Sequence, residues 1–278
     1  MTPRTNKRPH RRITAMTLVM CTGLAAIVLA ACGSSGTQIT TASKTSSTST
    51  TNAATTVPTT TSASGAPIAS NVQYNPKIVP SQFTDKITNP YTPWIPGTTH
   101  IFKGVRDGAP TKTRVTVTNQ TKKIMGVPCV TVQDVVTSNG SLVEKTTDWY
   151  SQDSKGNVWY FGEQTAEYAN GVVTTTAGTW EAGVDKAKPG IVMKAHPKKG
   201  DSYRQEFRPG VALDKATVLS TNATVKVPAG TFHHVVVTHD INPLDPSKKE
   251  LKWFAQGPGF IKAHLTSSQH HETVQLVK

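Results

Sequence analysis

Beyond about residue 110 the chain is a succession of short runs rich in β-branched and aromatic residues, separated by turn residues. Such runs are typical of strands, and no stretch between them is long enough for the helical crossover of a parallel sheet. The pattern predicts an all-β fold, either an antiparallel sandwich or an open barrel-like curved sheet. The clearest predicted strands lie within Arg114–Thr118, Val130–Val136, Thr146–Tyr150, Val158–Phe161, Gly171–Thr176, Ala216–Leu219, Val235–Thr238 and Leu251–Phe254.

Glycine-containing pairs mark the connections between these strands. Asp107-Gly108, Asn139-Gly140 and Asn170-Gly171 supply the positive φ angles that tight hairpins need, and Lys155-Gly156-Asn157 is a further turn. No second linker or internal repeat divides this part of the chain. Residues 73–278 are therefore predicted to form one mostly β domain.

The segment before the first strong strand is rich in proline and aromatic residues. Asn89–Gly97 has the sequence NPYTPWIPG and is predicted to pack across the first strand. One or two short helical turns are expected near Pro80 to Ile87.

The N-terminus has the features of an export signal. Several cations and no acid precede an apolar run from Ile13 to Ala31, which is the pattern of a signal peptide. The run ends in Leu29-Ala30-Ala31-Cys32, which resembles the lipobox of bacterial lipoproteins. The resemblance implies cleavage after residue 31 and lipidation of Cys32, which would anchor the protein by palmitate-type acyl chains to the outer face of the cytoplasmic membrane. A plain secretory signal and an uncleaved membrane helix are the alternatives.

Residues 32–72 are predicted to be a disordered tether that begins at the lipidated cysteine. Twenty of the thirty-two residues from Gly33 to Ser64 are Ser or Thr, and Lys44 carries the only charge. Such a stretch lacks the apolar side chains that offset the entropy of ordering a chain.

The net positive charge of the chain favours anionic partners. Removal of the five cations in residues 1–31 would lower the formal charge from +13 to +8. A cationic domain on a membrane anchor would be attracted to anionic envelope lipid or wall polymer. Nucleic acid is not an expected partner, because the basic residues are scattered and the compartment is wrong.

Several phrases of the domain resemble a family of secreted proteins and lipoproteins, chiefly from actinobacteria. The resemblance implies an all-β fold and supplies no activity or catalytic residue. The phrases are Asn89-Pro90-Tyr91 with Pro96-Gly97-Thr98, Asp148-Trp149-Tyr150, Gly156–Glu163, Gly200–Glu206 and Val227–Phe232.

No recognised catalytic or metal motif occurs in the predicted domain. Its one thiol, Cys129, lies in a β-branched run and is predicted to be a buried small apolar residue. His233 and His239 are six residues apart on one predicted strand, too far to share a metal ion. We therefore assign no catalytic residue, metal or cofactor.

Two aromatic phrases, Asp148–Tyr150 and Val158–Phe161, are predicted to form one hairpin. Alternation along a strand puts neighbouring rings on opposite faces, so one face is core and the other is a candidate groove for a glycan or an acyl chain. The candidate groove residues are Trp149, Tyr150, Trp159 and Tyr160. Trp159 is expected in the core, and the two tyrosines at a wet edge. The alternative is that all these rings fill the core.

The sequence thus favours a lipid-anchored cell-envelope protein that acts as a non-enzymatic binding or scaffolding module, with lipid or glycan as the ligand. The alternative is a cell-wall-modifying hydrolase that uses a pair of carboxylates. The candidate carboxylates are Glu163, Glu167, Glu181, Asp201 and Glu206.

The anchor assignment is tested by replacing Cys32 with Ala. We expect the variant to lose lipidation, so that it accumulates as precursor or is released to the medium. Partition into detergent micelles measures the outcome. A processed Cys32→Ala protein that still enters the micelles would show that the lipobox assignment is wrong.

Overall fold

The structure is a computed structural model that describes residues 74–268 and 270–278. The predicted signal peptide over residues 1–31, Cys32 and the predicted tether over residues 32–72 lie outside the described residues, and these assignments stay predictions. Within the described ranges there is no helix with the length and apolar character needed to span a bilayer.

The described residues form an antiparallel, almost purely β structure, which confirms the predicted fold class. The elements are η1 (Pro80–Gln82), β1 (Phe83–Thr84), β2 (Thr99–Arg106), β3 (Ala109–Ile124), β4 (Val127–Ser138), β5 (Ser141–Asp153), β6 (Val158–Ala169), β7 (Val172–Thr175), β8 (Trp180–Glu181), β9 (Lys188–Met193), β10 (Ser202–Arg204), β11 (Glu206–Phe207), β12 (Lys215–Val227), β13 (Gly230–Asn242), β14 (Asp245–Ala255), β15 (Gly259–Thr266) and β16 (His271–Leu276).

The helix expected near Pro80 to Ile87 is only the single 3-10 turn η1. The chain leaves this turn at Phe83 and pairs with β5 as strand β1. The ring of Phe83 packs edge-on against Trp159 and Phe161. The packing of this partly buried ring against the core and the ladder to β5 together favour the extended conformation over another helical turn.

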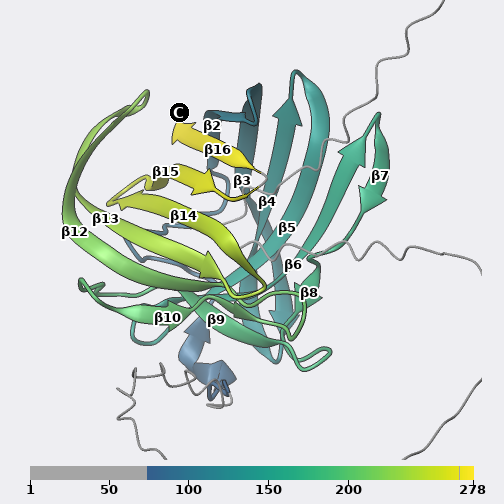
Figure 1. The fold of residues 1–278 in the computed structure, drawn as a ribbon. Coiled ribbons are helices and arrows are strands. Elements are labelled where there is room, and N and C mark those ends of the chain that lie inside the picture. The colour runs from purple at the N-terminus through teal and green to yellow at the C-terminus, as the bar shows by residue number, and fades with distance from the viewer. Residues whose placement is uncertain (1–73, 269) are drawn as a thin grey trace, which may run out of the picture. The chain divides into compact units, whose positions relative to one another are not determined.

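One long curved sheet contains most of the strands, in the order β10-β12-β13-β14-β15-β16-β2-β3-β4-β5-β6-β9-β11. Figure 1 shows β12, β13 and β14 curving opposite β3, β4 and β5. The sheet is nearly closed and barrel-like, which resolves the choice between sandwich and barrel that the sequence left open.

A short segment joins the two edges of this sheet. Strand β10 pairs with β12, and β11, which follows after Gln205, pairs with β9 on the other edge. Gln205 donates its backbone N–H to the carbonyl of Asp214 at 2.9 Å. At Gly190 of β9 an added Cβ would lie 2.3 Å from the backbone of Gln205. Residues 202–207 therefore close the sheet, and the closure requires glycine at position 190.

The tight turns follow the predicted glycine pairs. Asp107-Gly108, Asn139-Gly140 and Asn170-Gly171 all have positive φ at both positions, as two-residue hairpins of type I′ require. A fourth pair, Met125-Gly126, has the same geometry between β3 and β4. The sequence did not predict this turn because methionine rarely adopts a left-handed conformation.

The proline-rich lead-in forms hydrogen bonds with segments well beyond the first strand. Asn89 donates its side-chain amide to the carbonyls of Gly156 and Lys194, which follow β5 and β9. The carbonyl of Pro90 accepts from Gly257 in the β14–β15 turn, on the other wall. The lead-in thus ties together opposite sides of the sheet, and it carries Trp94 into the interior.

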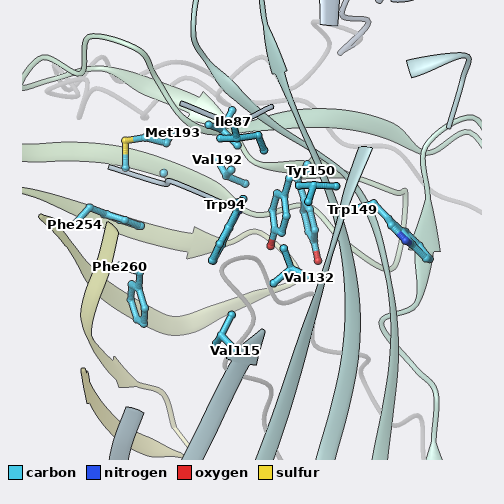
Figure 2. Packing of buried hydrophobic residues seen from close by; sticks show 14 of the residues in the cluster. Ile87, Trp94, Val115, Val132, Trp149, Tyr150, Val192, Met193, Phe254 and Phe260 are labelled. Atoms are coloured by element: carbon cyan, nitrogen blue, oxygen red, sulfur yellow. The ribbon is translucent and has the colours of Figure 1, made fainter. Parts of the chain in front are cut away.

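The interior contains both an apolar cluster and charged side chains. Figure 2 shows Trp94 of the lead-in close to Tyr150, with Val132, Val115 and Phe260 of the same buried cluster nearby. Among the described residues, nine carboxyl residues and only three cations are buried, so acids are in excess in the interior. The cations are Arg106, Lys248 and Lys252; the carboxyl residues are Asp134, Glu144, Asp148, Glu163, Glu206, Asp214, Asp240, Glu250 and Glu272.

Closure of the sheet is tested by Gly190→Ala. The added methyl group overlaps the backbone of Gln205, so we expect the free energy of unfolding to fall by about 3 kcal/mol or more, in the upper range for overpacked sites. Gly210→Ala is the control: its Cβ meets open space, and only its positive φ opposes the change, at about 1–2 kcal/mol. Urea denaturation measures both, and equal losses would contradict the closure.

Candidate functional site

The hairpin of β5 and β6 contains a bulge that fixes the direction of its aromatic side chains. Trp149 lies opposite Gly162, whereas Tyr150 lies opposite Tyr160, so β6 has one extra residue between these pairs. Gly162 has a φ of 142°, and a Cβ there would lie 2.4 Å from the carbonyl oxygen of Trp180. Only glycine fits this close approach of β8.

The two tyrosines of the predicted groove lie in the interior. The rings of Tyr150 and Tyr160 stack with centroids 4.8 Å apart, and Trp94 of the lead-in lies 5.5 Å from Tyr150. The Tyr160 hydroxyl donates to Asp148 Oδ1 at 2.5 Å. Both tyrosines are at most 1% exposed, so the wet edge expected for them is absent from this conformation.

The two tryptophans of the predicted groove lie on the outer face but do not meet. Trp159 is half-buried beside Phe83, and its Nε1–H donates to Asp153 Oδ2 at 2.8 Å. Trp149 is covered by Lys122, whose Nζ lies 3.7 Å from the ring centroid. Figure 2 shows Trp149 directed away from the cluster around Tyr150. The four predicted residues therefore do not form a single groove.

An inner cavity of about 20 Å³ lies beside Tyr150, large enough for roughly one water-sized group. Aromatic and aliphatic side chains form most of its wall, and two carboxyls and one imidazole complete it. His100 and Pro258 are partly exposed, so they lie at its rim. The cavity is lined by Trp94, His100, Phe102, Val115, Val132, Asp134, Asp148, Tyr150, Pro258 and Phe260.

Burial sets the protonation of the polar groups in the inner cavity. Desolvation raises the pKa of Asp134 well above its usual range, and the nearby carboxyls of Glu144 and Asp148 raise it further. Desolvation also raises the pKa of Asp148 to about 7, although the Tyr160 hydroxyl opposes the shift. Burial lowers the pKa of His100. The cavity therefore places two acids that can be protonated at neutral pH beside an imidazole that is mostly neutral.

An outer cavity of about 360 Å³ lies around Trp149 on the opposite face of the hairpin. Its rim holds two ion pairs: Lys122 with Glu181 at 2.6 Å, and Arg208 with Asp185 at 2.9 Å. Arg208 also donates to the carbonyl of Thr179. The lining residues are Lys122, Trp149, Glu163, Gln164, Thr179, Trp180, Glu181, Val184, Asp185 and Arg208.

The five candidate carboxylates are not gathered at one cavity. Glu163 and Glu206 are both fully buried, and the charge of Glu206 helps to raise the pKa of Glu163 after desolvation, which is the larger cause. Glu167 is half-buried at the far end of β6. Asp201 pairs with Lys194 at 3.0 Å.

Glu163 and Glu181 both line the outer cavity, but their side chains point to opposite faces. Glu163 lies opposite Trp180, whose ring contacts Tyr160 in the interior. Glu181 reaches Lys122 on the outer face. Residues that face each other across a ladder share a side of the sheet, so the two carboxyls diverge and do not form the pair that the hydrolase hypothesis needs.

Cys129 is fully buried, as predicted, and desolvation raises the pKa of its thiol far above the usual range. No three His, Cys, Asp or Glu side chains in residues 74–268 and 270–278 are arranged to hold a metal ion. His233 and His234 instead bond to Thr224 and Asn222 of the neighbouring strand.

Asp134 and Asp148 were not predicted from the sequence as site residues. A signal was present, because Asp134 lies two residues from Val132 and Val136, at a position where the alternation of β4 calls for an apolar side chain. A carboxyl at a core position indicates a specialised interior. The position of Asp148 near Asp134 could not be predicted in this way, because it depends on the register of β4 with β5, in which Val132 faces Asp148.

No protein-family model and no curated protein matches the chain. Among solved structures, the chain is similar to a Bacteroides fragilis protein described as exported and as having a YmcC-like fold, with 14% identity, a TM-score of 0.37, and coverage of 66% of this chain and 97% of that one. It is also similar to a Parabacteroides distasonis protein described as a lipoprotein, with 13% identity, a TM-score of 0.38, and coverage of 68% and 98%.

The buried acids predict that stability falls as pH rises from 5 to 8. The folded state holds protons on Asp148, Asp214 and Glu272 up to pH about 7, whereas the unfolded chain releases them near pH 4. Between these values the folded state binds more protons, so each such group lowers the free energy of unfolding by about 1.4 kcal/mol per pH unit. His100 has the opposite effect on the free energy of unfolding, because burial lowers its pKa, but it contributes only one proton.

Urea denaturation between pH 5 and 8 measures this dependence. Asp148→Asn removes one of the titrating groups, so its stability should vary less steeply with pH than that of the parent protein. A parent protein whose stability rises steadily over this range would contradict the protonation states assigned to the interior.

Proposed function

We propose that this chain is a lipid-anchored cell-envelope protein whose β domain binds a glycan in the outer cavity without catalysing a reaction. The export signal and Cys32 in the sequence support the location, and one feature of the outer cavity supports the binding. That feature is a space of about 360 Å³ with an indole ring in its wall and ion pairs at its rim. Small-molecule sites commonly fall between 300 and 1,000 Å³, so the space suits a ligand of one or two sugar rings.

The chemistry of the wall favours a glycan over an acyl chain. Hydroxyl groups of a glycan can form hydrogen bonds with the charged side chains of the wall, which are Lys122, Glu181, Asp185 and Arg208. An acyl chain would displace the water bound to these side chains and offer no hydrogen bonds in return. Trp149 offers an apolar ring on which the face of a sugar can pack once Lys122 moves aside. The side chain of Lys122 is 38% exposed, so it has room to move.

Binding is favoured over hydrolysis because the two acids at the rim of this cavity are each held in an ion pair, Glu181 with Lys122 and Asp185 with Arg208. Glu181 lies on the outer face in an ion pair, while Glu163 points into the interior. Hydrolysis by either common mechanism needs two carboxyl groups on the two sides of one glycosidic bond. The net positive charge of the mature chain adds long-range attraction to anionic wall polymers.

The proposal is tested by titrating the full chain, purified in detergent micelles, with soluble fragments of bacterial wall glycan. Trp149→Ala should weaken binding about tenfold or more, as truncation of a central aromatic anchor does. Trp159→Ala is the matched control, because this tryptophan lies on the outer face but outside the cavity; its affinity should match that of the parent protein.

A second variant separates binding from folding. Glu181→Gln breaks the partly exposed ion pair with Lys122 and leaves the core intact, so it should change affinity while the melting temperature stays close to that of the parent protein. If no wall fragment binds the parent protein, the glycan proposal fails and scaffolding remains. Release of new reducing ends during incubation would instead favour the hydrolase.

A further inference from the structure

The inner cavity contains buried polar atoms that no described residue satisfies. Asp134 is 5% exposed and Trp94 is 7% exposed, and both line the cavity. Asp134 Oδ1 and Trp94 Nε1 have no hydrogen-bond partner among the described residues. A buried carboxyl oxygen without a partner carries its full desolvation penalty, so a group that bonds to it inside the cavity would be stabilised.

The wall around these atoms is aromatic. Tyr150 stands 5.5 Å from Trp94, and Phe102 stands 5.3 Å from Phe260, measured between ring centroids. All four rings line the cavity. Aromatic rings attract cations through their negative faces, and the attraction increases when water is excluded. The wall therefore combines ring surfaces with two carboxyl groups, which is the chemistry that recognises an ammonium group.

The charges packed around Asp134 favour the same kind of ligand. Glu144 and Asp148 of β5 and Glu272 of β16 are acids that raise its pKa, and Arg106 of β2 is the one cation among the principal charges acting on it. Arg106 is itself paired with Glu272 at 3.1 Å. A positive ligand next to Asp134 would offset this excess of acids, whereas an anionic ligand would add to it.

We propose that the inner cavity binds a primary ammonium group, held between the carboxyls of Asp134 and Asp148 and the aromatic wall. The volume of about 20 Å³ admits a group the size of water, so the ammonium group enters and the rest of the ligand extends past the rim at His100 and Pro258. This site is separate from the outer cavity, and the proposal does not depend on glycan binding.

Binding of the cation displaces a proton. The ammonium group forms a charge-assisted hydrogen bond to an ionised carboxylate, so a carboxyl group that is protonated in the free protein releases its proton to solvent. Affinity should therefore rise as pH increases from 6 to 8, by up to tenfold per pH unit for one released proton. His100 at the rim is mostly neutral in this range, and the hydroxyl of Tyr160 keeps its hydrogen bond to Asp148.

The test uses the full chain in detergent micelles and methylammonium chloride as the probe. Calorimetry in two buffers of different ionisation enthalpy should show binding with release of about one proton. Methanol is the neutral probe of equal size and should bind at least tenfold more weakly. Tetramethylammonium is a cation too large for the cavity and should not compete.

Variants assign the site. Asp134→Asn removes the unpartnered carboxyl group, which can no longer ionise beside the cation, and should weaken methylammonium binding tenfold or more. The protein should stay folded, because a neutral amide replaces a carboxyl group that burial already keeps protonated in the free protein. Asp214→Asn is the matched control, because Asp214 is a buried interior acid whose pKa is also raised to about 7 but which does not line the cavity. Its affinity for the probe should match that of the parent protein.

Two further binding experiments distinguish a soluble amine from a lipid head group as the source of the ammonium group. Free ethanolamine tests a soluble amine, and vesicles in which ethanolamine head groups replace choline head groups test a lipid. Either arm supports the proposal if Asp134→Asn abolishes the effect. The proposal is overturned if methylammonium fails to bind at about 100 mM, which is well above the dissociation constant of roughly 6 mM that the best ligands with two non-hydrogen atoms reach. Equal binding to the parent protein and to Asp134→Asn, or equal binding of methanol, would show that the cavity holds a buried water only.

Discussion

One short segment connects two distant edges of the sheet, and this closure creates an enclosed interior. Residues 202–204 pair with β12, and residues 206 and 207 pair with β9, so one short segment connects strands at opposite ends of the strand order. The join depends on the close approach of Gln205 to Gly190, where no side chain fits. Side chains that point inward from the two walls are thereby removed from water, and this removal is the main cause of the raised pKa values in the interior.

The enclosed space is unusual in its chemistry. Within the described residues, buried acids outnumber buried cations by nine to three, although the full sequence is strongly basic. Some of these buried acids form ion pairs: Asp240 and Glu250 both pair with Lys252, at 3.0 Å and 3.2 Å. Pairs of this kind are often no more stabilising than apolar residues of the same volume. An acidic interior is therefore poorly explained by stability, and titratable groups with shifted pKa values are common where proteins bind or react.

The β5–β6 hairpin connects this interior with the outer surface. Trp149 and Tyr150 are consecutive, so the strand directs one ring to each face of the sheet. Trp149 faces a wide cavity with ion pairs at its rim, and Tyr150 faces a small one with buried carboxyls. The two cavities differ in size, in charge and in access to water. For that reason they suit ligands of different chemistry, although one hairpin forms part of both walls.

The sequence by itself determined the strands, their antiparallel pairing through tight turns, and the opposite directions of neighbouring rings. These features are local: a positive φ at Asn139-Gly140 and the alternation of Trp149 and Tyr150 depend on residues adjacent in the chain. Only the tertiary structure decided that the sheet closes, that the tyrosines lie inside, and that Asp134 and Asp148 share a cavity with Trp94. Each of these depends on contacts between segments far apart in sequence, for which the chain carries no local signal, because the free energy of such a contact arises from burial that exists only once the sheet has curled.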